Sequence, residues 1–556
     1  MRFYLSLYLL IAGFYLLTAS GRIGRMSDST AMFNVAQSMI NEGSLSSEPC
    51  DPRLDTADLG PLCVPGTGGR FYSAYGLVPS LLVVPAILLA KSVSTVLHLN
   101  SLLIAKASVS IFTLLLAPLT CVVLAMWILR LGYGRRTAIL GACVLGFGSP
   151  FWQNSVSGFL SEPYFTLALL VAAYLLSGPR IRYACALSGF AFGMACATRV
   201  AGIMLFPAFI LSLAFESRAH RLPRTHFLRD ALQFSAVFAV CTSLIAWTNY
   251  ARFGSVFKTG YHIAFPSISF TLSNPLLQGT RDLLFNGEVG LLIFAPWAVL
   301  VFLCFPQFMR MHLPESVLCW TIFLASLLFY AKYEQWHGGW TGGPRYLLPT
   351  LPFLVMVIVP TVEAIQGRAA MRQNQRFWAV LRSLTVLLLA AGFIIQAVTV
   401  SFPRDRYYAL AMFYRHRPLK PWWTGSIPLA SVDYWSQTSI PKTEAASTGL
   451  DRSLTVAPAV SDPWAFADAA ATQGEFLSLF PNPENLALPE LMLLKGRLMG
   501  LPAIAIWGYV IAVLIIILTG VFGLKRYTSA TGSKAVIQDY DERDYDGSYV
   551  ASKPVS

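Results

Sequence analysis

Long apolar segments alternate with short polar loops along most of this 556-residue chain. A membrane-spanning helix needs about 20 apolar residues. By this criterion we expect twelve spans, near residues 3–19, 103–129, 137–156, 163–177, 183–198, 202–215, 232–249, 289–305, 317–331, 347–362, 379–399 and 503–522. The first is expected to stay in place, because no small-residue cleavage site follows it before Arg22. The pattern predicts an all-α, polytopic membrane protein.

One further apolar segment, 77–97, decides the topology, because every later loop changes sides if it crosses the bilayer. Lys and Arg in short loops are retained in the cytoplasm. With twelve spans and the N-terminus inside, sixteen Lys and Arg residues fall in cytoplasmic loops and six in the opposite ones. This count favours a long first outside loop, 20–102, in which 77–97 lies in or on the outer leaflet. Pro79 and Pro85 suit a broken juxtamembrane helix there.

The composition agrees with a membrane protein. Hydrophobic residues make up 55% of the chain and charged residues 12%, whereas soluble domains carry about 25% charged residues. The net charge of +13 is spread singly through short loops, which indicates topology signals and no nucleic-acid partner.

The polar stretches divide the chain into regions. Residues 1–400 form the expected transmembrane catalytic domain, and 401–502, rich in Pro and Trp, form a small extracytoplasmic domain or an ordered loop. Residues 503–524 are the last span. Residues 525–556 are expected to be a disordered cytoplasmic tail.

Two of the nine cysteines differ from the rest. Seven lie in or beside apolar spans, where a free cysteine packs as a small hydrophobe. Cys50 and Cys63 both lie in the first outside loop, so they are candidates for a disulfide in an oxidising compartment. The alternative is two unlinked thiols. No Cys and His spacing resembles a zinc site.

The first outside loop contains a carboxylate at the start of a predicted helix. Asp28 precedes an apolar periodicity that ends near Gly43, so it is either an N-cap or a functional acid. Further along the same loop, Arg70 and Tyr75 belong to a basic and aromatic cluster, whose alternative explanation is an interfacial anchor belt.

Two later outside loops concentrate further polar chemistry. One carries Arg252, Lys258, Tyr261 and His262. The other combines glycines with the side chains of Glu334, Trp336, His337, Trp340, Arg345 and Tyr346. A guanidinium at the membrane surface beside glycines suits a lipid-linked phosphate; the alternative for Arg345 is an arginine that extends to the interface.

Several segments together resemble one family. These are the Asp28 helix, FYSAYGLVPSLLVVP, Glu162 after the third span, TRVAGIMLFP around Arg199, NYARFGSVFKTGY, GEVGLLIFAPW and WTGGPRYLLPTLPFL. Their order over residues 1–400 resembles bacterial glycosyltransferases of the GT-C superfamily, in the branch with lipid A aminoarabinose transferase and protein O-mannosyltransferases. The resemblance implies a polyprenyl-phosphate sugar as donor, and it also implies a long first outside loop with juxtamembrane helices.

The resemblance assigns roles to particular positions. It implies that Asp28 is the catalytic base and that Arg345 and Tyr346 meet the donor phosphate, with Lys258 or Arg252 as a second basic contact and Arg70 as a looser match. The other cavity residues expected are Glu162, Arg199, Tyr75, His262, Glu334, Trp336, His337 and Trp340. Many relatives have a second acidic residue where this chain has Ser29, so a divalent cation is left open and no cofactor is assigned.

We expect a sugar transfer to a hydroxyl of a lipid, glycan or protein acceptor on the periplasmic face of a bacterial inner membrane. Asp28 as a lone base favours inversion, whereas retention would need a second carboxylate such as Glu162. A transporter or flippase would place ionisable residues within its spans, which here are nearly free of charge. A ligase that uses a diphosphate-linked glycan would need the same face and the same cations. In a non-enzymatic scaffold, the loops rich in glycine and tryptophan would be structural.

Overall fold

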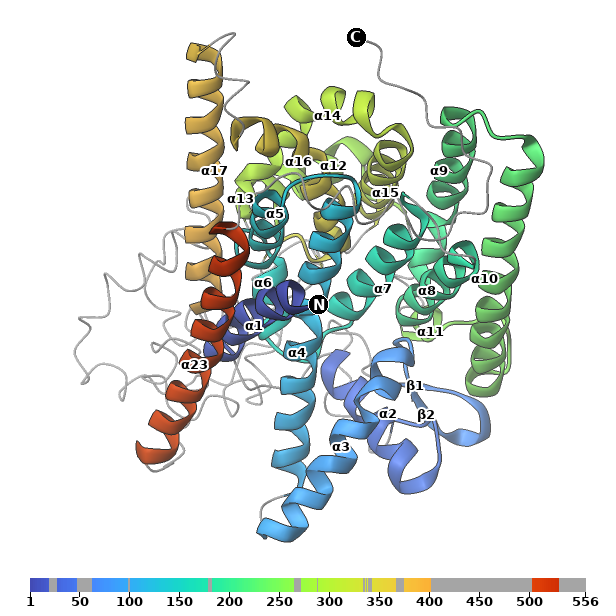
Figure 1. Cartoon of the computed structure of the whole chain (residues 1–556). Helices are drawn as coiled ribbons and strands as arrows, with labels where there is room; N and C mark the ends of the chain where they lie inside the picture. Colours follow the sequence, from blue (N-terminus) through green and yellow to red (C-terminus); the bar gives the residue numbers. More distant parts are fainter. Residues whose placement is uncertain are drawn as a thin grey trace, which may run out of the picture.

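The computed structural model describes residues 1–19, 28–47, 63–98, 101–178, 183–264, 272–287, 289–333, 336, 338, 343–366, 375–401 and 503–529. They form a helical bundle with one small β-hairpin (Figure 1). The first helices are α1 (Arg2–Leu17), α2 (Asp28–Glu42), α3 (Val78–Leu97), α4 (Ser101–Arg130), α5 (Arg135–Phe147), α6 (Phe151–Val156), α7 (Ser161–Leu176) and α8 (Ala184–Thr198). The remaining α-helices are α9 (Phe206–Ala219), α10 (Arg224–Phe253), α11 (Gly260–Ala264), α12 (Leu276–Phe285), α13 (Leu291–Phe294), α14 (Val299–Met311), α15 (Leu313–Lys332), α16 (Leu351–Gln366), α17 (Gln375–Ser401) and α23 (Ala503–Ser529).

Short 3₁₀ helices join or extend several of these elements. They are η2 (Thr67–Gly69), η3 (Val200–Leu205), η4 (Pro296–Ala298) and η5 (Arg345–Thr350). η3 leads directly into α9, and η5 leads directly into α16.

The predicted polytopic helical fold is confirmed. Within the described residues, eight helical segments are long and apolar enough to cross a membrane, and four shorter apolar helices accompany them. One predicted span, 137–156, is wrong as a single helix: α5 ends at Phe147 and α6 begins at Phe151. The sequence between them is Gly-Ser-Pro, and a proline cannot donate the backbone hydrogen bond that would continue the helix.

The segment that decides the topology forms one continuous helix, α3. Pro79 lies in its first turn, where a proline leaves no hydrogen bond unmade, and the helix continues through Pro85. The expectation that these prolines break the helix is therefore wrong. α3 packs against α2 and α4 and is long enough to span; its place in the outer leaflet stays a prediction.

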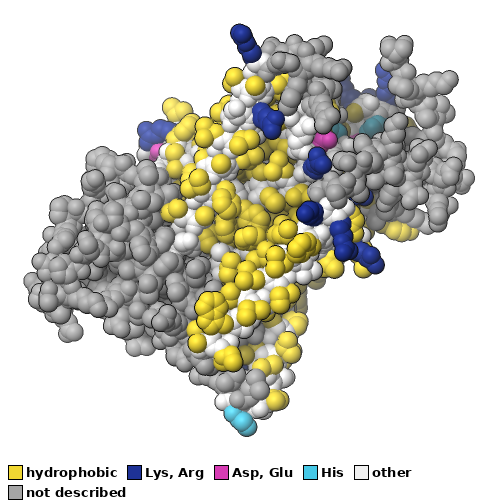
Figure 2. All heavy atoms as spheres, turned by 60° about the vertical axis from the view of Figure 1, so that its left-hand side comes forward, with side chains coloured by type: hydrophobic (Ala, Val, Ile, Leu, Met, Phe, Trp, Pro, Cys, Tyr) yellow, Lys and Arg dark blue, Asp and Glu magenta, His cyan; other side chains and the backbone are white. Residues whose placement is uncertain are grey.

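The core lies around α16, which is almost entirely buried, whereas α10, α17 and α23 expose most of their apolar side chains. Figure 2 shows one such outer face, covered by hydrophobic side chains, with the visible Lys and Arg gathered in its upper half. An apolar outer surface of this kind is expected of helices that lipid surrounds.

The first and last described helices pack closely together. A Cβ atom at Gly13 would lie 2.5 Å from Ile517, and one at Gly520 would lie 2.6 Å from the backbone nitrogen of Leu10. The Tyr509 hydroxyl donates to the carbonyl of Leu16 at 2.7 Å. Glycines allow two membrane helices to approach to backbone contact, so α23 completes the bundle beside α1.

The first loop folds as helix α2 and a hairpin, which Figure 1 shows together at one end of the molecule. The antiparallel strands β1 (Cys63–Pro65) and β2 (Phe71–Ser73) pair in the register Cys63 to Ser73, Val64 to Tyr72 and Pro65 to Phe71. α2 is tied to α3 by the Ser80 hydroxyl, which donates to the carbonyl of Met32 at 2.8 Å. The hairpin rests on the end of α10, where Thr67 donates to the carbonyl of Ala251 at 2.6 Å.

The region predicted as an extracytoplasmic domain, 401–502, lies outside the described residues except for its first residue, which ends α17. The predicted cytoplasmic tail lies outside them after 529. The last helix continues to Ser529, beyond the predicted boundary at 524.

Candidate functional site

Two carboxylates and two guanidiniums from distant parts of the chain meet in one site. The Arg345 guanidinium donates from Nη2 to the Asp28 carboxylate and from Nε to Glu162 Oε1. Arg199 donates from Nη1 to the same Glu162 oxygen at 2.6 Å. We call Asp28, Glu162, Arg199 and Arg345 the acid–base quartet. With two negative and two positive charges, the quartet is neutral when all four groups are ionised.

Exposure distinguishes the members of the quartet. The Glu162 side chain is fully buried, at 0% exposure, and it is occupied by two guanidiniums. The Asp28 and Arg345 side chains keep 15% and 11% of their surface exposed. Asp28 and Arg345 can therefore meet a ligand, whereas Glu162 holds the two arginines in place from behind.

Each member stands where a helix begins or ends. Asp28 and Glu162 lie in the first turns of α2 and α7, where the helix dipole stabilises a negative charge. Arg199 follows the last residue of α8 in extended conformation, and Arg345 begins η5. The quartet therefore falls at the ends of apolar segments and not within them.

Glycines allow the loop before Arg345 to approach it. Gly338 has φ +72°, and a Cβ there would lie 3.2 Å from Cβ of Arg345. Gly343 has φ +78°, and its carbonyl accepts the backbone N–H of Arg345 at 2.8 Å. Both positions lie in the left-handed region that favours glycine.

Tyrosine rings line one side of the quartet. The rings of Tyr330 and Tyr346 stack with centroids 4.4 Å apart and planes within 2°, and Tyr333 meets Tyr346 edge to face. The Arg199 guanidinium lies over the Tyr346 ring, 5.6 Å from its centroid. Such a wall places cation–π contacts and hydroxyl groups beside the charged groups.

A second pair of tyrosines lies on the Asp28 side. The Tyr75 hydroxyl lies beside the Asp28 carboxylate, within reach of a hydrogen bond, and its ring meets Tyr261 edge to face at 5.5 Å. Burial, with the nearby Asp28 carboxylate, raises the pKa of Tyr75 well above its usual value, and burial also raises the pKa of Tyr261. Tyr75 therefore stays protonated and acts as a hydrogen-bond donor to Asp28.

The structure thus brings together six of the predicted site residues, namely Asp28, Glu162, Arg199, Arg345, Tyr75 and Tyr346. Four other predicted positions lie outside the described residues, namely Cys50, Glu334, His337 and Trp340.

The remaining predicted residues have other surroundings. Arg70 is exposed and donates to the Ser44 hydroxyl at 3.1 Å, and Lys258 is exposed. Arg252 is buried and donates to backbone carbonyls. His262 is paired with Thr259 at 2.9 Å, and Trp336 packs against the main core.

Tyr330 and Tyr261 were not among the predicted site residues. Tyr261 belongs to the same motif as Lys258, and that motif was the available signal. Tyr330 lies near the end of an apolar span, where a tyrosine ordinarily indicates an interfacial anchor, so nothing in the sequence distinguished it.

Cys63, at the start of β1, is disulfide-bonded, while the seven cysteines of the spans are free. This is the bonded state predicted for Cys63, and its pairing with Cys50, which lies outside the described residues, stays a prediction. No three His, Cys, Asp or Glu side chains gather as metal ligands among the described residues. Both carboxylates of the quartet are bound to the Arg345 guanidinium in the structure.

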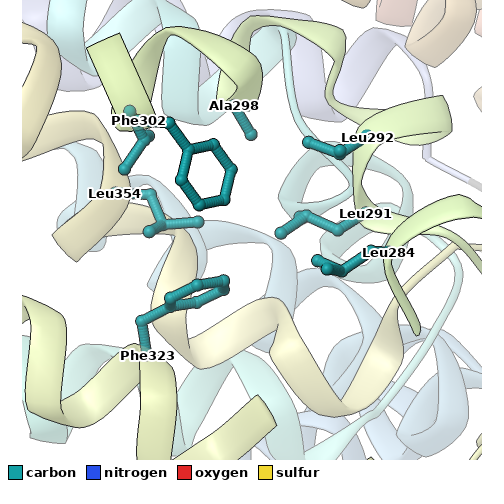
Figure 3. A pocket seen from close by; sticks show the side chains of 8 residues that line it. Leu284, Leu291, Leu292, Ala298, Phe302, Phe323 and Leu354 are labelled. Carbon is teal, nitrogen blue, oxygen red and sulfur yellow. The ribbon is translucent and has the colours of Figure 1, made fainter. Parts of the chain in front are cut away.

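A small apolar pocket lies among α12 to α16 (Figure 3). It is lined by Leu284, Leu291, Leu292, Ala298, Val301, Phe302, Phe323 and Leu354. Phe323 lies on α15, seven residues before Tyr330 of the tyrosine wall. The pocket contains hydrophobic side chains alone and brings no chemistry of its own.

Neither a protein-family model nor a curated protein matches the sequence. The structure is similar to the apo oligosaccharyltransferase of Archaeoglobus fulgidus, with a TM-score of 0.48 at 12% identity over 84% of this chain and 63% of that chain. It is also similar to ArnT from Cupriavidus metallidurans bound to undecaprenyl phosphate, with a TM-score of 0.41 at 13% identity over 95% of this chain and 77% of that one. The chain spans less than two thirds of the length of the Archaeoglobus protein.

Proposed function

We propose that this protein is a membrane glycosyltransferase of the GT-C type that moves a sugar from a polyprenyl-phosphate donor to an acceptor hydroxyl. One observation carries the proposal: a carboxylate and a guanidinium separated by 317 positions meet directly in a partly open site. The same pair is what the reaction needs, because a phosphate must be held as it leaves and a hydroxyl must lose its proton.

Arg345 is the residue that we assign to the donor phosphate. Its guanidinium is partly exposed and already binds two carboxylates, so an incoming phosphate can take over the Asp28 contact without leaving the cation unpaired. Guanidinium groups bind phosphate through two parallel hydrogen bonds. Glu162 keeps its contact with Arg345 throughout and so fixes the direction in which the guanidinium points.

Asp28 is the residue that we assign to the base. Once the donor phosphate occupies Arg345, the Asp28 carboxylate is released from that ion pair and retains the hydrogen bond from Tyr75. It is then the partly exposed carboxylate of the quartet that can accept a proton. Glu162 is sealed and bound by two arginines, which argues against its acting as a covalent nucleophile.

The proposed reaction is a single displacement. The acceptor oxygen forms a bond to the anomeric carbon as the bond from that carbon to the phosphate oxygen breaks. The hydroxyl proton passes to Asp28, and the electron pair leaves with polyprenyl phosphate, whose charge Arg345 and Arg199 stabilise. A single displacement, in which one base deprotonates the attacking hydroxyl, inverts the anomeric centre.

We place the site on the periplasmic face of a bacterial inner membrane. The sixteen Lys and Arg residues of the predicted cytoplasmic loops support this orientation.

The test is transfer by the purified full-length chain in sealed proteoliposomes, with polyprenyl-monophosphate and polyprenyl-diphosphate sugars supplied separately. We expect release of polyprenyl phosphate from the monophosphate donor alone. Asp28→Asn should lower kcat by about 10²- to 10⁴-fold while binding of polyprenyl phosphate persists. Asp230→Asn, which changes a carboxylate paired with Arg229 on α10, is the matched control and should leave kcat unchanged.

Each contrary outcome has a definite meaning. Turnover of the diphosphate donor alone would assign the protein to the ligase class, and movement of the intact donor across the bilayer without transfer would assign it to the flippases. Substantial residual turnover in Asp28→Asn would remove Asp28 from the role of base.

A further inference from the structure

Arg252, at the end of α10, is a buried arginine whose partners are not carboxylates. Only 5% of the Arg252 surface is exposed to solvent. Its guanidinium donates from Nη1 to the carbonyls of Ser73 and Tyr75, at 3.3 and 3.4 Å, and from Nη2 to the Asn249 side-chain oxygen at 3.1 Å. Nε donates to the carbonyl of Thr248 at 3.3 Å. Within the described part of the chain, no carboxylate forms an ion pair with it.

These contacts leave Arg252 little capacity for a ligand. An arginine has five N–H donors, and four hydrogen bonds to neutral oxygens are already in place. The guanidinium also lies against the Phe253 ring, 4.8 Å from its centroid. A phosphate could reach it only by displacing the backbone carbonyls, so the geometry favours a role other than the donor contact predicted for it.

The two carbonyls that Arg252 binds belong to the loop that carries Tyr75. This loop, 73–76, lies between two other segments at backbone contact. A Cβ at Gly76 would lie 2.3 Å from the carbonyl oxygen of Ala197, and one at Gly260 would lie 2.3 Å from Cα of Ala74. The loop is thus fixed from three sides, by α8, by α11 and by the Arg252 guanidinium.

We propose that Arg252 is a positioning residue, which fixes loop 73–76 through two carbonyls so that the Tyr75 hydroxyl stays hydrogen-bonded to Asp28. This inference rests on the proposed function, because it gives Tyr75 the task of orienting the base. An arginine is needed for it, since a planar fork can reach four separated acceptors and the single nitrogen of a lysine cannot.

The two roles of Arg252 predict opposite results for Arg252→Lys. A phosphate contact would be largely maintained by the lysine charge. A positioning role would not, so we expect kcat to fall about tenfold or more while the Kd for polyprenyl phosphate, without a sugar, changes less than about threefold. Arg252→Met should behave like Arg252→Lys, and Arg345→Met should instead lose polyprenyl phosphate binding.

A second set of measurements follows the loop itself. In Arg252→Lys, amide hydrogen exchange should accelerate in residues 73–76. In a Tyr75→Phe background, the same substitution should lower kcat by less than it does in the wild type, because both changes act through one hydrogen bond. Asn249→Ala, which retains both carbonyl contacts, is the control for a general loss of folding. It should reduce kcat much less than Arg252→Lys does.

The outcomes separate this inference from the function on which it rests. Loss of polyprenyl phosphate binding in Arg252→Lys with kcat maintained would overturn the positioning role and restore the donor contact. Unchanged exchange and additive effects with Tyr75→Phe would also overturn it. Absence of both binding and transfer in the wild type would overturn the proposed function, and the catalytic meaning of the Arg252 contacts with it.

Discussion

A comparison of Arg345 with Arg252 shows how the charge of an arginine's partners determines what the arginine can do in a site. Arg345 is bound by carboxylates and is partly open, whereas Arg252 is bound by neutral oxygens and is closed. An ion pair can exchange one anion for another, so Arg345 can accept a phosphate in place of Asp28. A guanidinium bound by backbone carbonyls has no anion to exchange, and its contacts serve to fix the backbone.

The largest effect is expected when the negative charge of Glu162, which pairs with Arg345, is removed. Glu162→Gln leaves two guanidiniums facing one carboxylate, and disruption of a buried pair costs about 3–5 kcal/mol of stability. We therefore expect a marked fall in the thermal unfolding temperature. Binding of polyprenyl phosphate should be maintained or tightened, because the ligand would restore the missing negative charge.

The matched change beside Arg252 is Asn249→Ala, which removes one neutral acceptor. A hydrogen bond to a charged group contributes about 1.5–3 kcal/mol, so the unfolding temperature should fall less than in Glu162→Gln. Equal losses of stability in the two variants would contradict the contrast between the arginines.

A smaller effect is expected from Gly76→Ala. The added Cβ would meet the backbone oxygens of Ala197 and Thr198 at 2.3 and 2.4 Å, so loop 73–76 must shift. We expect kcat to fall about threefold to tenfold, by loss of the Tyr75 contact with Asp28, with polyprenyl phosphate binding unchanged. In Gly508→Ala, on α23, the Cβ meets nothing within 4 Å, and this control should leave kcat unchanged.

The smallest effect is expected at His312, a half-buried side chain outside the site whose hydroxyl partner is neutral. His312 lies within 2.8 Å of the Tyr133 hydroxyl, and burial lowers its pKa below 6.5. The unfolded chain therefore binds a proton more readily, so stability should fall as the pH decreases through about 6.5. Thermal unfolding between pH 7.5 and 5.5 should show a smaller decrease in His312→Gln than in the wild type.

Much of the fold could be predicted from apolar periodicity, whereas the expectation that Asp28 and Arg345 share one site came from the resemblance to GT-C glycosyltransferases. The break between α5 and α6 was missed because the flanking residues continue the apolar pattern across Gly148 and Pro150. The contacts of Arg252 could not be predicted either. Its acceptors include carbonyls 177 and 179 positions away, and a backbone carbonyl has no signature in residue type.

The close packing of α1 against α23 has a consequence for biosynthesis. α1 is synthesised long before α23, so the surface around Gly13 has no partner until Ile517 has been made. During translation, lipid or an insertion factor must occupy that surface. A nonsense mutation ahead of α23 would leave α1 permanently unpaired, even though every residue of the acid–base quartet had already been made.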